Sequence, residues 1–149
     1  MDHDLVTLTE CTLSFISHTA LRHLTRRRYG VAEALWRETL IDAARFREWI
    51  VNVGQRPAIS RLAHMAIEMR ERLKVIGKGE GDSIEMPFTQ EQLGEAMGIT
   101  PVHVNRVVKQ LRDEGVLEFS RGAVTVIDER RLLQLADFDD VYLHQTPSS

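Results

Sequence analysis

Cysteine is almost absent from this chain of 149 residues, in which Cys11 is the single example. One cysteine excludes an internal disulfide and a metal cluster held only by cysteines of this chain. No apolar run is long enough to cross a bilayer, and the N-terminal ten residues lack the basic and apolar regions of a signal peptide. These absences predict a soluble protein of the cytoplasm without a membrane partner.

Motifs of catalysis and of metal binding are missing as well. Nothing resembles a nucleophile beside its base, a phosphate-binding loop or a pair of catalytic carboxylates. His18, His23 and Cys11 do not have the spacing of metal ligands, and we expect His64 to be a packed, hydrogen-bonded residue. The sequence therefore predicts no enzyme activity, no cofactor and no metal.

The segment 89–97 has the start signal of a short helix. Thr89 and Gln92 are spaced as a capping box, which satisfies the free amide donors of a helix that begins at Gln90. Gly94 stands where the next helix has to pass closely, because glycine has no side chain in the way. Thr89 is also the candidate DNA contact on this helix.

A tight turn and a second helix follow. Gly98 is suited to the left-handed conformation that ends a helix, and Ile99 is expected beneath the turn. Thr100 and Pro101 are suited to the N-cap and the first position of the second helix. Two helices joined at these offsets predict a helix-turn-helix, which makes double-stranded DNA the first partner to consider.

The second helix has an apolar stripe and an opposite polar face. At about 100° per residue, the stripe that must face the core consists of Val104, Val107, Val108 and Leu111. On the polar side we expect Arg106 to read base edges, with Asn105 and His103 next. Lys109 is expected on phosphate. An ordinary amphipathic helix with a solvated polar face is the alternative interpretation.

A β-hairpin is predicted after the second helix. Residues 116–119 and 123–127 are short runs rich in β-forming residues, and a Ser-Arg-Gly turn joins them. Residues 83–88 can supply a third strand. Two helices followed by a hairpin predict a winged helix, in which Arg121 at the tip of the turn is placed to contact phosphate. A solvated turn residue is an equally good interpretation of Arg121.

Residues 1–28 are predicted to be the remnant of a β-domain. The segments 5–9 and 12–16 alternate between apolar and polar residues as strands do, and a helix is expected from Ser17. Two strands cannot form a stable sheet alone, so their uncovered apolar face predicts partner binding or poor solubility.

A long helix is predicted over 31–53, before Gly54 and Pro57. It is apolar on two sides and therefore needs two neighbours. One neighbour is predicted to be the same helix of a second chain in a parallel coiled-coil-like homodimer, and burial inside a single domain is the alternative. The residues predicted to form the dimer contact are Leu35, Phe46, Trp49, Ile50 and Val53.

The complete prediction is a mainly α-helical protein with a small β component. A hydrophobic content of 43% is enough to bury a core. The predicted parts are the β-domain remnant (1–28), the dimerisation helix (29–54), a winged helix-turn-helix domain (55–140) and a tail (141–149), disordered from His144.

Two further helices are predicted inside the winged helix-turn-helix domain. The helix over 58–76 is expected to pack on the winged helix and to direct its cations outward, namely Arg61, Arg70, Arg72 and Lys74. Asp128 is suited to cap a last helix over 129–136. The intervening segments are expected to be a hinge at 53–57 and a flexible loop at 77–82.

The formal net charge of -3 is opposite to the basic balance of many nucleic-acid-binding proteins. The acids, however, gather in the segments 80–85 and 137–140. The predicted reading elements carry Arg106, Lys109 and Arg121 instead. We therefore expect modest non-specific affinity for DNA, and binding that weakens steeply with salt.

The order of these motifs resembles the Crp/Fnr superfamily of bacterial transcription regulators, to which the cyclic-AMP receptor protein belongs. The resemblance runs from CTLSFISHTALRHL through VAEALWRETLIDAARFREWIV and ISRLAHMAIEMRERL to FTQEQLGEAMGITPVHVNRVVKQL. It implies a homodimer that places one recognition helix per subunit in successive major grooves of a palindromic site, with RNA polymerase as a further partner. The family's DNA-contact positions correspond to Thr100, Val102, His103 and Arg106.

Two departures from the family pattern bear on function. Val102 stands where many members have a glutamate that accepts a hydrogen bond from cytosine, and it is suited to contact a thymine methyl group instead. Most of the family's sensory β-barrel is not in this sequence, and Phe46 and Arg47 stand where cyclic-AMP-binding members have small hydroxyl residues. The resemblance therefore implies a regulator with a truncated sensor, and neither cyclic-nucleotide binding nor iron–sulfur sensing is predicted.

Two functions are consistent with the sequence. The first is a sequence-specific transcription regulator that binds palindromic DNA as a homodimer. The second is a protein-interaction subunit that heterodimerises with a full-length relative through the long helix and changes the activity of that relative.

Overall fold

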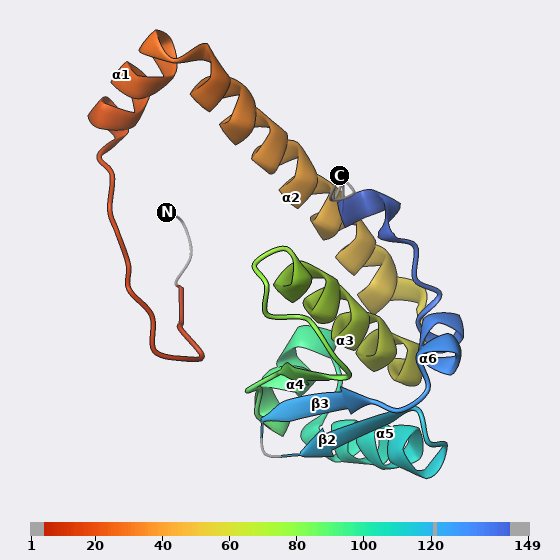
Figure 1. Ribbon diagram of the computed structural model, residues 1–149. Coiled ribbons are helices and arrows are strands. Elements are labelled where there is room, and N and C mark those ends of the chain that lie inside the picture. The colour runs from red at the N-terminus through yellow and green to blue at the C-terminus, as the bar shows by residue number, and fades with distance from the viewer. Residues whose placement is uncertain (1–4, 121, 144–149) are drawn as a thin grey trace.

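A long helix leads into a smaller head of helices and strands in the computed structural model, which describes residues 5–120 and 122–143 (Figure 1). In chain order the elements are α1 (His18–Arg27), α2 (Tyr29–Gln55), α3 (Ala58–Lys74), β1 (Ser83–Glu85), α4 (Gln90–Met97), α5 (Pro101–Asp113), β2 (Leu117–Ser120), β3 (Ala123–Val126), α6 (Glu129–Ala136) and the 3-10 helix η1 (Asp140–Leu143). This order confirms the predicted fold class, with mainly helical structure and a winged helix-turn-helix.

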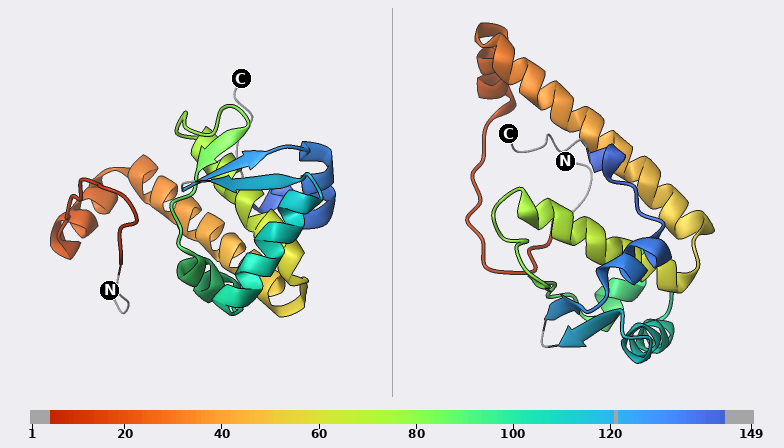
Figure 2. Two further views of the ribbon diagram at one scale, coloured as in Figure 1. Left: turned by 90° about the horizontal axis from the view of Figure 1, so that it is seen from below. Right: turned by 45° about the vertical axis from the view of Figure 1, so that its right-hand side comes forward.

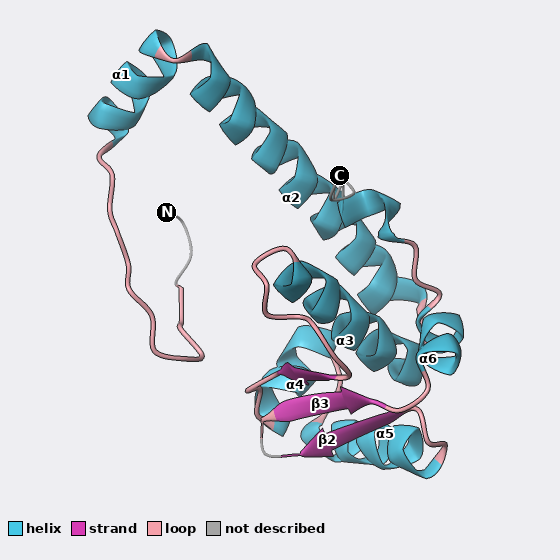
Figure 3. Cartoon of the chain, in the orientation of Figure 1, coloured by secondary structure: helices cyan, strands magenta, loops and turns pink. Residues whose placement is uncertain are grey.

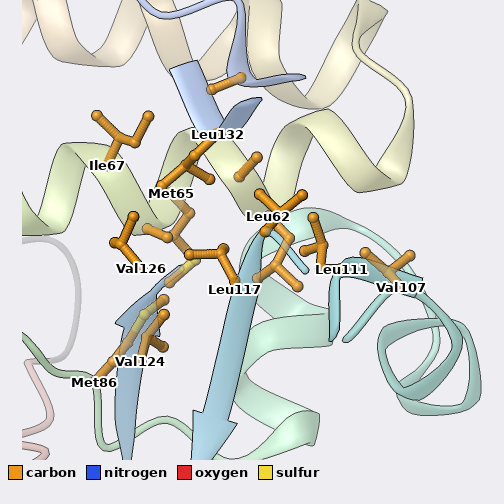
Figure 4. Close-up of a cluster of buried hydrophobic side chains, with 14 of the residues drawn as sticks. Leu62, Met65, Ile67, Met86, Val107, Leu111, Leu117, Val124, Val126 and Leu132 are labelled. Carbon is orange, nitrogen blue, oxygen red and sulfur yellow. The ribbon is translucent and has the colours of Figure 1, made fainter. Parts of the chain in front are cut away.

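The head has a hydrophobic core between its helices and its sheet (Figure 4). The strands pair antiparallel in the order β1-β3-β2, so the last strand lies in the middle (Figure 3). Val124 and Val126 alternate along β3 and are buried in one cluster with Leu62 of α3 and Leu111 of α5. The core therefore fixes α5 by its apolar stripe and leaves the opposite face of this helix to solvent.

Helix α3 is more deeply buried than its sequence pattern predicts. It contacts α2, α4, α5 and α6, and the predicted outward direction of Arg70 is wrong, because this residue is buried and forms an ion pair with Glu129 of α6. Arg61 is half-buried as well and donates to two backbone carbonyls. The prediction assumed a single packed face, whereas four neighbouring helices cover this one.

The strands predicted at 5–9 and 12–16 are wrong for this structure, in which residues 5–17 form neither helix nor strand. The physical reason is that this segment has no neighbouring strand with which to pair, because every described strand belongs to the sheet of the head. The apolar side chains of this segment are exposed, among them Phe15. The predicted helix from Ser17 is confirmed, because Ser17 accepts a hydrogen bond from Ala20 N–H and caps α1.

Helix α2 continues through Gly54 to Gln55, so the link to α3 is shorter than the hinge predicted at 53–57. It consists of Arg56 and Pro57, both in extended conformation. Pro57 cannot donate a backbone hydrogen bond and precedes the first turn of α3, where such a donor has no partner.

The C-terminal segment returns from the head to the long helix (Figure 2). Helix α6 packs on α3, and η1 then packs on α2. Few side chains of α2 are buried, namely Ile41, Ala44 and Asn52. Much of the contact between α2 and the rest of the molecule is therefore polar.

A cluster of polar and aromatic side chains, here called the joint cluster, fills this contact. Its members are Glu48, Trp49, His64, Glu68, Phe138 and Tyr142. Glu68 is 1% exposed and accepts from Trp49 Nε1 at 3.2 Å and from the Tyr142 hydroxyl at 2.9 Å. One buried carboxylate thus joins α2, α3 and η1.

His64 lies at the centre of the joint cluster and is 0% exposed. Its ring stacks on Tyr142 with centroids 5.9 Å apart and tilts against Phe138 at 5.4 Å. Burial lowers the pKa of His64, and Arg56 acts in the same direction against Glu68 and Glu48. Burial likewise raises the pKa of Tyr142, so its hydroxyl keeps the proton that it donates to Glu68. The prediction that His64 is packed and hydrogen-bonding agrees with its 3.4 Å contact with the Tyr142 hydroxyl.

Candidate nucleic-acid interface

The first helix of the interface, α4, starts as its sequence predicts. Thr89 accepts from Gln92 N–H at 3.2 Å, and the Gln92 side chain accepts from Thr89 N–H at 2.9 Å. This reciprocal pair is a capping box. Gly98 ends the helix with φ 65, in the left-handed conformation that favours glycine. Both predicted boundaries of α4 are confirmed.

The turn between the two helices is tightly packed. A Cβ atom added to Gly94 would lie 2.6 Å from the carbonyl oxygen of Ile99, so the close approach predicted at Gly94 is made by the turn. Arg61 of α3 donates from Nη1 to the carbonyl oxygen of Met97 and from Nε to that of Arg56, both at 2.8 Å. The bond from Arg61 to Met97 could not be predicted from the sequence, because these two residues are far apart in the chain.

The second helix, α5, begins at Pro101 and is capped by Thr100, whose hydroxyl oxygen accepts from His103 N–H at 3.3 Å. The predicted apolar stripe is confirmed, because Val104, Val107 and Leu111 are buried and Val108 is half-buried against the core. Stripe and cap together fix the rotation of α5 about its axis. Its opposite face is consequently held in one orientation.

That exposed face carries the predicted DNA-contact residues. Val102 is 68% exposed, and Asn105, Arg106 and Lys109 are exposed along the same side of α5. His103 is half-buried at the edge of this face. Within the described part of the chain, no residue forms a hydrogen bond or an ion pair with the side chain of Arg106 or Lys109. Both cations are therefore available to a partner.

A hydrogen bond crosses the helix-turn-helix on this face. Nε2 of Gln90, the first residue of α4, donates to Oδ1 of Asn105. The sequence analysis did not identify Gln90, although its place beside the capping box could have drawn attention to it. Asn105 is thus oriented by a neighbour, whereas Arg106 is not.

The wing is tied to the end of α5. Arg112 donates from Nη2 to the carbonyl oxygen of Phe119 in β2 at 3.2 Å. This contact orients the hairpin relative to the exposed face. Arg121, the predicted phosphate contact at the tip, lies outside the described residues.

The residues predicted for the dimer contact on α2 do not all face the same way. Leu35, Phe46, Ile50 and Val53 are exposed. Trp49 is half-buried against the core of the head, and its indole N–H donates to Glu68. Trp49 is therefore an internal contact of the head, and Val53 lies beside Gly98 of the head while staying partly exposed. Leu35, Phe46 and Ile50 remain on the open side of the helix.

The described residues form neither a membrane-spanning helix nor a cluster of metal ligands. None of their helices combines the length and the apolar character that a membrane span needs. No three of their histidine, cysteine, aspartate or glutamate side chains are grouped so that they could hold a metal ion. The exposed face of α5 is the candidate functional surface that the described part of the chain presents most clearly.

The comparison with protein families agrees with this geometry. The model of the Crp-like helix-turn-helix domain matches residues 60–135, about half of the chain. The chain belongs to the Crp/Fnr family. The match covers α3 and the winged helix-turn-helix, so the family is assigned on the same elements that build the exposed face of α5.

Curated relatives of this Crp/Fnr protein are regulatory proteins by name. The transcriptional activator protein FnrL of Cereibacter sphaeroides is 24% identical over 141 residues, which are 92% of this chain and 57% of FnrL. The nitrogen fixation regulation protein FixK of Bradyrhizobium diazoefficiens is 26% identical over 95 residues, 64% of this chain and 40% of FixK. The chain thus spans about half the length of the curated relatives it matches.

Among solved structures, FixK2 from Bradyrhizobium japonicum has the same fold, with a TM-score of 0.71 at 23% identity. The superposition covers 80% of this chain and 59% of FixK2. At this identity, the likeness supports the arrangement of helices and strands and no individual contact.

Proposed function

We propose that this Crp/Fnr chain is a sequence-specific regulator that binds palindromic promoter DNA as a homodimer, with α5 of each protomer in the major groove. The exposed face of α5 carries this proposal, because Asn105 and Arg106 are of the types that contact base edges. The N-cap of α5 and its buried apolar stripe hold that face in one orientation. Helix α5 lies at the end of the molecule opposite α1 (Figure 1). The name of FnrL, a transcriptional activator, supports a role in transcription, and that of FixK supports a regulatory role.

Each residue of this face has a proposed role. Arg106 reads a guanine through its two parallel donors, and Val102 contacts a thymine methyl group. Lys109 lies one turn further along α5 and neutralises phosphate. Thr89 and Thr100 each use the hydroxyl oxygen as a cap acceptor, and their O–H donors remain for phosphate oxygens.

The homodimer is supported by the open side of α2. Trp36, Phe46 and Ile50 are 68%, 72% and 72% exposed, which is unusual for large apolar side chains. Residues on this side recur at alternating steps of three and four, as in the seam of a coiled coil, at Trp36, Thr39, Ala43, Phe46, Ile50 and Val53. Two parallel copies of α2 would bury this seam and bring two heads to one duplex.

The same seam also suits a heterodimer with a longer relative, which is the alternative function. The two proposals differ in what the purified chain does alone. A homodimer binds a palindromic duplex without any other protein, whereas a heterodimerising subunit needs its relative for DNA binding.

The roles on α5 are tested with two variants and one control. Arg106→Ala is expected to weaken binding to the preferred duplex by about 1–3 kcal/mol and to relax the preference at one base position. Lys109→Ala is expected to weaken binding to all sequences alike and to reduce its salt dependence. Lys78→Ala, which removes an exposed cation from a loop outside this face, is the matched control.

Affinities are measured by fluorescence anisotropy on the preferred duplex, on its single-base variants and at two salt concentrations. Equal losses on every sequence for Arg106→Ala and Lys109→Ala would show that the two roles are not separate. No binding by the unmodified chain at low salt, together with binding after addition of a relative, would favour the alternative function.

A further inference from the structure

The hydrogen bond between Gln90 and Asn105 restricts what Asn105 can present to DNA. Gln90 is the first residue of α4, and its Nε2 donates to the amide oxygen Oδ1 of Asn105 in α5. Both side chains are exposed on the face that carries Arg106. The contact therefore acts at the surface proposed to read bases, and it crosses from one helix to the other.

An asparagine side chain has one acceptor oxygen and one donor amino group. The usual contact with adenine uses both, because the oxygen accepts from N6 while the amino group donates to N7. When the oxygen of Asn105 is turned toward Gln90, its Nδ2 amino group is the part that points away from α4. The orientation that gives a two-point contact with adenine is then lost.

We infer that Gln90 is a specificity-determining residue, which turns Asn105 toward a base without an amino donor in the major groove and away from adenine. This inference rests on the DNA-binding function proposed above. Guanine offers two acceptors in the major groove, O6 and N7, and thymine offers O4. Cytosine offers only its N4 amino donor there, and adenine places its N6 amino donor beside its single acceptor N7, so the amino group of Asn105 faces a second donor on either base. The preferred bases opposite Asn105 are therefore guanine and thymine.

Gln90 also prepares Asn105 for binding. A free side chain loses rotational freedom when it meets a base, whereas one already held by a neighbour loses less. Gln90 itself needs no base contact for this effect, so it is a positioning residue. Its role differs from that of Arg106, whose side chain is held by no described residue.

The experiment selects bound duplexes from a random pool with the unmodified protein and with three variants. Asn105→Ala identifies the base position that Asn105 reads. Gln90→Ala frees the amide oxygen and is expected to reduce the preference for guanine or thymine over adenine at that position by about tenfold. Gln90→Glu replaces the donor with a group that only accepts, so Asn105 must donate to it and turn its oxygen outward.

Gln90→Glu is therefore expected to reverse the preference toward adenine or cytosine, whose amino groups donate to an oxygen. The variant keeps Thr89 as the cap, and a glutamate in the first turn is favourable for a helix. Thermal unfolding of both Gln90 variants at the temperature of the unmodified protein confirms that α4 is intact. If the hydrogen bond between Gln90 and Asn105 had no effect on base reading, both Gln90 variants would select the same base as the unmodified protein.

The outcomes separate this inference from the function on which it rests. Enrichment of no sequence by the unmodified protein overturns both. A defined half-site with adenine at the Asn105 position overturns the inference alone, and so does an unchanged base preference in Gln90→Glu. A shift from guanine or thymine to adenine or cytosine, confined to that one position, supports it.

Discussion

The same substitution, glycine to alanine, is expected to have opposite effects at two helical positions of this chain. At Gly54, near the end of α2, an added Cβ atom would meet nothing within 4 Å. Alanine there gains helix propensity, which stabilises the fold by about 0.5–1 kcal/mol. At Gly94 in α4, the same atom would lie 2.6 Å from the carbonyl oxygen of Ile99.

The magnitude at Gly94 follows from three contributions. A carbon–oxygen contact needs about 3.3 Å, so the turn has to move by about 0.7 Å. Such overpacking costs about 1–3 kcal/mol. The movement also weakens the 3.0 Å hydrogen bond from Ile99 N–H to the Gly94 carbonyl oxygen, worth about 1 kcal/mol, which offsets the gain in helix propensity. Gly94→Ala is therefore expected to destabilise the fold by about 1–3 kcal/mol.

Both variants are compared by urea unfolding at one protein concentration, because the proposed dimerisation would make the apparent stability depend on concentration. The midpoint of Gly94→Ala is expected below that of the unmodified protein, and the midpoint of Gly54→Ala above it. If Gly94→Ala were as stable as Gly54→Ala, the turn would not be packed against α4 as described, and the orientation of α5 would need another explanation.

Two further predictions concern α2 and the joint cluster. Phe46→Glu places a charge in the proposed seam and is expected to give a monomer in sedimentation, whereas Val75→Glu, an exposed control in the turn after α3, is expected to leave the dimer intact. His64 is neutral in the fold with a lowered pKa, so the unfolded chain binds its proton first as the pH falls below 6.5. Stability is then lost by at most about 1.4 kcal/mol per pH unit. In urea titrations between pH 7 and 5.5, His64→Gln is expected to abolish this loss of stability, whereas the control His23→Gln, at an exposed position, is expected to keep it. If the free energy of unfolding fell equally steeply with pH in both variants, the loss would not come from His64.

The helix-turn-helix could be predicted almost to the residue because its signals are local. A capping box at Thr89, a left-handed glycine at Gly98 and a proline after Thr100 each act within one turn of the chain. The exposed face of α5 follows from the same periodicity, because the core needs the opposite side. Local rules therefore place the site as well as the helices.

Contacts between distant segments could not be predicted in this way. The ion pair of Arg70 with Glu129 and the bonds of Arg61 depend on which helices surround α3, and a helical wheel shows one helix at a time. The pairing of Gln90 with Asn105 depends on the angle at which α4 and α5 cross. At 5–17 the alternating pattern was read as strands, but a strand needs a neighbour that the pattern itself does not supply.

The return of η1 to α2 has a mechanical consequence. A head joined to α2 only through Arg56 and Pro57 could rotate about the single bonds of that link. A rotation of α2 about its own axis would then not be passed on to the head. The hydrogen bond from Trp49 to Glu68 and the packing of η1 on α2 add a second point of attachment, away from the axis of the link. With two points of attachment, torsion of α2 is transmitted as torque, and in the proposed homodimer a twist between the paired long helices becomes a change in the angle between the two heads.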